Sequence, residues 1–361
     1  MASFRAWGMK SLRGCISSAS SKSARRAHLR SRIGTFGTFV HHNTAMHSTM
    51  PPKEERDDFS IGEMIRKKGP RNDVKQLPRD PEFLRVEVGS IDGMSDFEIS
   101  LFAQTMNKYG AAVLAPDEDP EAGLAAYRML DKLLGKAVWH DQMDERGVVE
   151  INPAKPTSIN VANPKSPHLP HTDDAYTEQP ARFITLQCRE AAPSGGGESV
   201  LVSGVELLAA LTSEELRALM QPGMVTMGRR PAKDGSWMKC SSIPMFWVNG
   251  ESGWLQLRWR CNDGCVQDVS DEAVSAYERM DAVARGEVHQ LVVQLAAREI
   301  LIVDNRAVAH GRRSFNNNEP RVLWRRNYYG DGELSDRLSV GMCAAFSSVF
   351  EPCSSVFDPL P

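Results

Sequence analysis

The spacing of apolar residues before about residue 158 is that of amphipathic helices. Apolar side chains recur at intervals of three and four in residues 95–110 and 119–136, which predicts a helix in each stretch. Ser95 and Glu98 form a capping box for the first helix, and Gly110 provides its stop signal. The run "AAVLA" that follows reads as a short buried strand.

After residue 158 the pattern changes to short runs rich in β-branched and aromatic residues, separated by Gly, Pro and Asn. Helical spacing returns only near 204–220 and 271–285. The pattern predicts a mainly β fold with flanking helices, a β-sandwich of jelly-roll type. The predicted strands are 182–188, 199–204, 244–250, 254–261, 289–295, 299–305 and 322–330.

Charge is distributed unevenly along the 361 residues. Residues 1–53 contain nine Lys or Arg and no acid, and they are rich in Ser. This composition is typical of an organelle transit peptide, with the mitochondrion favoured over the plastid, or of a disordered basic tail in a cytoplasmic protein. Residues 54–90 are Pro- and charge-rich and are predicted to wrap the surface, and 91–361 are predicted to form one catalytic domain.

The rest of the composition excludes several classes of protein. All 46 acidic residues follow residue 53, so the folded part has no basic excess that would suit nucleic acid. No apolar run is long enough to span a bilayer, so we expect no membrane partner. The seven irregularly spaced cysteines do not form a four-cysteine zinc pattern, and reduced thiols are expected.

The stretch "HLPHTDDAY", residues 168–176, is the first candidate for chemistry. If the chain is extended here, alternation places His171 and Asp173 on one face and Asp174 on the other. An iron site of this kind needs a second histidine, and His310 in "EILIVDNRAVAHGRRSF" follows a strongly apolar strand. The alternatives are surface or core histidines, or a zinc hydrolase, although the helical H-E-x-x-H pattern is absent.

Four blocks in order, "HTDDAYTEQPARFITLQC", "GGGESVLVSG", "DNRAVAHGRRSF" and "RVLWR", resemble the iron(II)/2-oxoglutarate dioxygenases of the taurine dioxygenase type. That group includes clavaminate synthase and the γ-butyrobetaine and trimethyllysine hydroxylases. The resemblance covers roughly residues 90–345. It implies a double-stranded β-helix, which is a jelly roll, with iron(II) as the metal and with 2-oxoglutarate and O2 as co-substrates.

The resemblance also implies roles for individual residues. His171, Asp173 and His310 would be the iron ligands, while Arg321 and Ser199 would bind the 5-carboxylate of 2-oxoglutarate. Arg325 matches a second arginine, which reaches the anionic group of the substrate in taurine dioxygenase, and it is expected here to contact either the substrate or 2-oxoglutarate.

Each of these residues also has a plainer interpretation. Arg321 and Arg325 could be solvated strand charges, and Ser199 could be a turn residue. The remaining expectations are a surface position for Arg326, a supporting or turn-capping role for Asp304 and Asn305, pocket positions for Lys165, His168 and Tyr176, and core positions for Trp259 and Trp324.

The expected reaction is hydroxylation of an unactivated C–H bond in a small anionic, amino-acid-like or betaine-like substrate, with release of succinate and CO2. Desaturation or oxidative ring closure, as in clavam or kainoid biosynthesis, would use the same cofactors. A non-catalytic jelly roll that binds a metal or ligand is the alternative from another class. A homo-oligomer is left open.

Overall fold

The computed structural model describes residues 74–117, 124–154, 166–229, 240–261, 265–316 and 318–344. All of them belong to one compact unit, Asp57–Pro361. The predicted leader, residues 54–73 and Lys165 lie outside the described residues. None of the helices in the described ranges has both the length and the apolar character that a membrane crossing requires.

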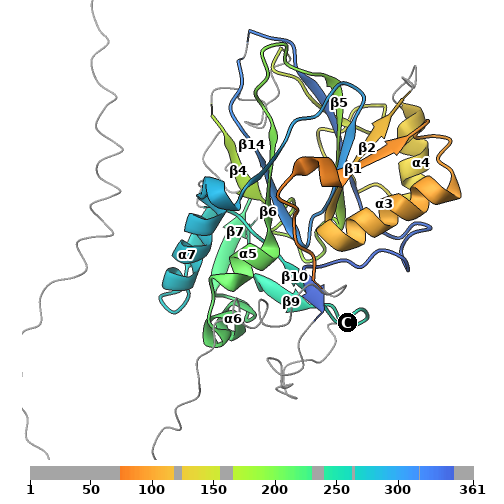
Figure 1. Cartoon of the computed structure of the whole chain (residues 1–361). Helices are drawn as coiled ribbons and strands as arrows, with labels where there is room; N and C mark the ends of the chain where they lie inside the picture. Colours follow the sequence, from red (N-terminus) through yellow and green to blue (C-terminus); the bar gives the residue numbers. More distant parts are fainter. Residues whose placement is uncertain are drawn as a thin grey trace, which may run out of the picture. The chain divides into compact units, whose positions relative to one another are not determined.

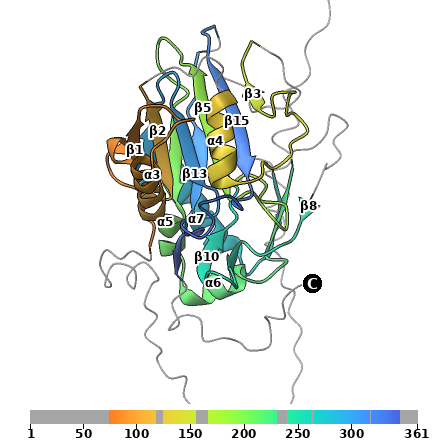
Figure 2. The ribbon, with the colours of Figure 1, turned by 90° about the vertical axis from the view of Figure 1, so that its right-hand side faces the viewer.

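A six-stranded sheet in the order β1-β2-β13-β5-β15-β3 forms the larger half of the jelly roll (Figure 2). Its neighbours pair antiparallel except β1 and β2, which are parallel. The strands are β1 (Arg85–Val88), β2 (Ala111–Pro116), β3 (Val149–Ile151), β5 (Phe183–Glu190), β13 (Ile300–Asp304) and β15 (Val322–Tyr328).

A four-stranded sheet in the order β12-β6-β14-β4 forms the smaller half and carries the candidate site (Figure 1). Its strands are β4 (His168–His171), β6 (Ser199–Ser203), β12 (Leu291–Val293) and β14 (Val308–Arg312). Two three-stranded sheets contain β7 (Val225–Gly228), β8 (Cys240–Ser241), β9 (Phe246–Val248), β10 (Trp254–Leu257), β11 (Val266–Val269) and β16 (Cys343–Ala344).

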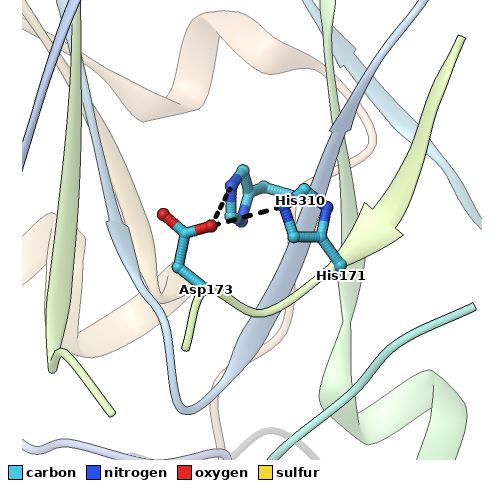
Figure 3. A group of neighbouring side chains, drawn as sticks. All are labelled: His171, Asp173 and His310. Atoms are coloured by element: carbon cyan, nitrogen blue, oxygen red, sulfur yellow. Dashed lines mark ion pairs between the residues drawn. The ribbon is translucent and has the colours of Figure 1, made fainter. Parts of the chain in front are cut away.

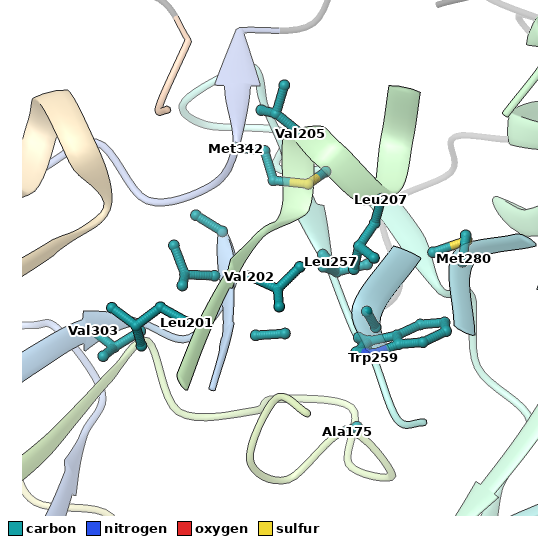
Figure 4. Close-up of a cluster of buried hydrophobic side chains, with 14 of the residues drawn as sticks. Ala175, Leu201, Val202, Val205, Leu207, Leu257, Trp259, Met280, Val303 and Met342 are labelled. Atoms are coloured by element: carbon teal, nitrogen blue, oxygen red, sulfur yellow. The ribbon is translucent and has the colours of Figure 1, made fainter. Parts of the chain in front are cut away.

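Strand β13 shows how the sequence divides the core into two layers. All five of its residues are buried, so both faces of the strand are covered. Leu301 and Val303 belong to the cluster between the two sheets, part of which Figure 4 shows around Leu201, Val202 and Trp259. Ile300 and Ile302 belong to a second cluster, between the large sheet and the helices α3 (Asp96–Tyr109) and α4 (Leu124–Leu134). The two-residue period thus assigns alternate side chains to the two layers.

The helix predictions are confirmed in type and differ in extent. Helix α3 has the predicted capping box of Ser95 and Glu98, and it ends at Gly110, whose φ of 75° is the left-handed conformation that glycine adopts without strain. The helix predicted at 204–220 is two helices, α5 (Gly204–Ala209) and α6 (Ser213–Leu219), because a second capping box at Thr212 starts a new one. Helix α7 (Val274–Arg285) matches the last prediction; two short 3₁₀ helices, η1 (Pro81–Leu84) and η3 (Glu287–His289), were not predicted.

The described part of the segment expected to wrap the surface is more buried than its composition suggests. Val86 and Val88 alternate inward and form the edge strand β1, because the short apolar alternation dominates over the surrounding charges. Lys75 is also buried and forms an ion pair with Asp304. The predicted strands 254–261 and 289–295 are shorter than expected, as β10 and β12.

Candidate metal centre and anion pocket

Strand register places two histidines side by side at one end of the small sheet. Strands β14 and β4 are antiparallel neighbours, and His310 lies directly opposite His171. Residues that face each other across two strands have their side chains in contact range. Their ring centroids are 4.4 Å apart. His171 and His310 are far apart in the sequence, and the pairing of β4 with β14 brings them together.

The third residue, Asp173, reaches the pair from a turn and not from a strand. We expected strand alternation to align His171 and Asp173, but β4 covers His168–His171 and ends before Asp173. Asn305, in the turn between β13 and β14, fixes its position. The buried Asn305 side chain accepts a hydrogen bond from the Asp173 backbone N–H at 2.7 Å and donates to the Asp173 carbonyl at 3.0 Å. The expected supporting role of Asn305 corresponds to this contact.

Figure 3 shows the three side chains pointing toward one another. One ligand atom from each of His171, Asp173 and His310 can be chosen so that all three lie within 4.8 Å of one another. Asp173 Oδ1 is 3.4 Å from His171 Nε2 and 4.0 Å from His310 Nε2. Nδ1 of His171 lies 2.9 Å from the Leu169 carbonyl, to which it can donate, and this contact orients Nε2 toward the carboxylate.

The other carboxylate oxygen of Asp173 is held by two donors from β15. Arg325 donates to Oδ2 at 3.2 Å and Asn327 donates at 3.0 Å. Burial would raise the pKa of Asp173, but the charge of Arg325 and the hydrogen bond and charges of the two histidines hold it well below its usual value. Asp173 is thus a carboxylate with Oδ1 directed at the imidazoles.

Burial lowers the pKa of His310, whereas it would raise that of Asp173. Burial and then the neighbouring charge of His171 lower the pKa of His310 to about 3. His310 is therefore a neutral imidazole at physiological pH, the form that binds a metal. Its buried Nδ1 has no hydrogen-bond partner within the described part of the chain. Two imidazoles and one carboxylate on one face are the donor set of non-haem iron(II) centres.

A cavity beside these residues is lined by His168, Ser199, Arg312, Arg321 and Arg325, together with both imidazoles. Arg321 is buried, and one of its terminal nitrogens donates to the Gly197 carbonyl at 2.6 Å. Its other terminal nitrogen is buried and has no partner among the residues described. A guanidinium with unused buried donors fits a carboxylate ligand. Ser199 lies opposite Arg312 across β6 and β14, which brings both residues to the same cavity.

Gly197 makes room for this arginine. Its φ is 68°, and a Cβ built there would lie 2.5 Å from Nε of Arg321. The glycines after Ser194 are therefore needed by the backbone and by the arginine that packs on it.

Arg325 differs from its expected role. It does not face the cavity unpaired, because it binds Asp173 and lies 3.3 Å from His140 Nε2. Because Arg325 is already paired with Asp173, its charge does not by itself require an anionic group on the substrate. Arg326, expected at the surface, is partly buried and forms an ion pair with Asp131 at 3.2 Å.

The remaining predicted positions agree with the structure. His168 Nε2 lies 3.2 Å from His171 Nε2, at the wall of the cavity. Tyr176 lines a second cavity. Asp304 accepts hydrogen bonds from the backbone N–H of Arg306, in its own turn, and from that of Gly341, and Trp259 and Trp324 are buried.

The profile of the family described as "Taurine catabolism dioxygenase TauD, TfdA family" matches residues 73–326. The chain belongs to the TauD/TfdA dioxygenase family. The resemblance drawn from four sequence blocks and the jelly-roll prediction are therefore confirmed. No curated protein sequence matches the chain.

Solved structures of similar fold include a non-heme iron oxygenase. The non-heme iron oxygenase OrfP, in complex with Fe, succinate and (3S)-hydroxy-L-Arg, is 14% identical with a TM-score of 0.51, over 70% of this chain and 87% of OrfP. AAD-2, in complex with Mn(II) and N-oxalylglycine, is 15% identical with a TM-score of 0.50, over 72% of this chain and 98% of AAD-2. The asparagine oxygenase AsnO is 18% identical with a TM-score of 0.47, over 65% of this chain and 78% of AsnO.

Several residues at the site were not found from the sequence. Asn327 is two residues after Arg325 on a strand, so alternation could have placed both on one face. Arg312 stands in "HGRR", where its strand position gave the same kind of signal. His140 gave none, because it comes from an irregular stretch and meets Arg325 only through the fold.

Proposed function

We propose that the protein is an iron(II)- and 2-oxoglutarate-dependent dioxygenase that hydroxylates an unactivated C–H bond of a small amino-acid-like or betaine-like substrate. The observation that carries this proposal is the convergence of His171, Asp173 and His310 beside a cavity that contains the unused donors of Arg321. The three side chains would bind the metal, and Arg321 would bind a carboxylate in the same cavity.

His171, Asp173 and His310 would hold the metal, and Arg321 with Ser199 would bind the distal carboxylate of 2-oxoglutarate. With 2-oxoglutarate and O2, bound iron(II) supplies an oxidant able to remove hydrogen from an unreactive C–H bond. One oxygen atom enters the substrate and the other enters succinate, with loss of CO2.

The protein's own groups contribute geometry and charge. Arg325 and Asn327 bind Oδ2 of Asp173 and so leave Oδ1 for the metal. Asn305 fixes the Asp173 backbone, and the Leu169 carbonyl orients the ring of His171. These contacts set the ligand positions before a metal binds, which lowers the cost of assembling the site.

Support for an amino-acid-like substrate comes from the similar fold of OrfP, whose structure holds (3S)-hydroxy-L-Arg. Desaturation and ring closure use the same cofactors. Product mass separates them, because hydroxylation adds one oxygen atom and the other two remove two hydrogens.

The test is aerobic incubation with iron(II), ascorbate and 2-oxoglutarate, with succinate as the readout. We expect slow succinate release without substrate, faster release with the right one, and none from Asp173→Ala. Asp336→Ala, which removes an exposed aspartate, is the control and should behave as wild type. Full turnover by Asp173→Ala, or no succinate from wild-type protein that has bound iron, refutes the proposal.

The composition of residues 1–53 supports a further proposal, that they direct the protein to an organelle, the mitochondrion in preference to the plastid. A fluorescent protein fused after residue 53 should co-localise with that organelle. A diffuse cytoplasmic signal would contradict this.

A further inference from the structure

A second cavity, of about 710 Å³, lies beside the metal-ligand turn. Its volume is in the range of small-molecule sites. Asp174, the residue directly after the ligand Asp173, lines it together with His140 and Tyr176. A small adjoining cavity is lined by Asp174, His140 and Arg325, and Arg325 also lines the cavity at His171 and His310.

Two aromatic side chains that line this cavity have exposed surface that a bound molecule would cover. Trp139 is 77% exposed and Tyr329 is 38% exposed, and both line the cavity. Large apolar surface that is left open at a cavity indicates a ligand-binding site. Aromatic rings also favour organic cations through their π faces.

The charges of the cavity are not balanced. Its one lining arginine, Arg229, already donates to both carboxylate oxygens of Asp141 at 2.8 Å. Asp174 accepts only the Tyr176 hydroxyl, at the long distance of 3.4 Å, and has no ion-pair partner among the described residues. Its side chain therefore presents unused acceptor oxygens to the cavity.

The turn fixes the backbone that carries this side chain. Thr177 donates to the Asp174 carbonyl through both its backbone N–H, at 2.8 Å, and its hydroxyl, at 2.9 Å. Asp174 has a φ of 56°, which aspartate and asparagine tolerate better than most residues. Asparagine can thus replace it without a change of backbone.

We propose that this cavity is the substrate site and that Asp174 binds a protonated amino group of the substrate through N–H···O hydrogen bonds. The inference rests on the proposed function and narrows its substrate class to molecules with an N–H-bearing ammonium group, such as amino acids, in place of anions without one. A quaternary ammonium group could contact the aromatic rings, but it has no N–H to satisfy the Asp174 oxygens.

The test uses four probes with one carbon skeleton: butylamine, butyltrimethylammonium, butyrate and butanol. Their binding to the full chain, loaded anaerobically with iron(II) and 2-oxoglutarate, is measured by saturation-transfer NMR. Wild type should prefer butylamine, and Asp174→Asn should weaken butylamine binding about tenfold or more with little change for butanol. Asp141→Asn is the matched control and should weaken butylamine about twofold at most, because Arg229 already neutralises that acid.

Three results would overturn the proposal: no preference for butylamine over the other probes, preferred binding of butyltrimethylammonium or butyrate, or an equal loss of butylamine binding in both variants. Succinate release without substrate is measured on the same preparations. Its absence would refute the dioxygenase proposal, whereas the probe preference reports on the cavity alone, so the two failures can be told apart.

Discussion

Replacing Asn305 with alanine should weaken the metal site without touching any ligand side chain. Asn305 is completely buried, and its amide makes three hydrogen bonds. It accepts from the Asp173 N–H at 2.7 Å, and it donates to the Asp173 carbonyl at 3.0 Å and to the Ala181 carbonyl at 2.9 Å. The variant removes all three and leaves three buried backbone groups without their partners.

The size of the effect follows from these three groups. A buried polar group that loses its partner costs about 1–3 kcal/mol, and water that enters the space left by the amide recovers part of this. We therefore expect the free energy of unfolding of the metal-free protein to fall by roughly 2–4 kcal/mol. Because Asp173 is then free to shift, iron(II) affinity should fall by about 10- to 100-fold, the range typical for loss of a group that orients a ligand.

Two measurements separate these effects. Urea unfolding with a chelator present gives the stability of the metal-free protein, and anaerobic calorimetric titration with iron(II) gives the affinity. The control is Asn107→Ala, because the Asn107 side chain also donates to a carbonyl and accepts from an N–H, those of Arg337 and Ser339, at a place remote from the metal ligands. It should lower stability and leave iron affinity unchanged. If Asn305→Ala loses stability but binds iron like wild type, Asn305 does not position Asp173 for the metal.

Three further predictions concern the cavity and pH. Arg321→Lys should raise the dissociation constant of 2-oxoglutarate by about 10-fold or more, since an ammonium cannot form the paired bonds of the planar guanidinium; equal affinity would contradict its role. Gly197→Ala should also weaken 2-oxoglutarate binding while iron binding stays, because the new Cβ would lie 2.5 Å from Nε of Arg321; unchanged calorimetric titrations of 2-oxoglutarate would argue against this contact. Burial and then the charge of His171 lower the pKa of His310 from 6.5 to about 3. At a pH between these two pKa values, the unfolded chain takes up a proton at His310 that the folded metal-free protein does not take up. The free energy of unfolding should therefore fall with decreasing pH, by up to about 1.4 kcal/mol per pH unit, and His310→Gln should reduce this slope in chelator-treated protein; an unchanged slope would assign it to other groups.

The sequence predicted the fold class because its strand and helix periods are strong and local. The buried strand β13 and the capped helix α3 both follow from a few adjacent residues. The break between α5 and α6 was missed although Thr212 and Glu215 spell a capping box, because the apolar spacing continues across it. Strand β4 is absent from the predicted strands because Pro170 lacks the N–H that strand pairing uses, yet the strand includes this proline.

The candidate ligands could be chosen from the sequence because few histidines follow the leader, and because four separated blocks resemble one family. What could not be predicted is how the ligand Asp173 is held. Asn305, Arg325 and Asn327 reach it from turns and strands more than 130 positions away, and only the fold reveals these contacts. The same limit explains why Arg325 was expected to face the substrate and not a neighbouring carboxylate.

The most direct test of the central claim is anomalous diffraction at the iron edge from crystals grown anaerobically with iron(II) and 2-oxoglutarate. The account predicts a single strong peak within coordination distance of His171 Nε2, Asp173 Oδ1 and His310 Nε2, with the distal carboxylate of 2-oxoglutarate on the Arg321 guanidinium. A peak elsewhere, or one that lacks any of these three side chains as a ligand, would contradict it.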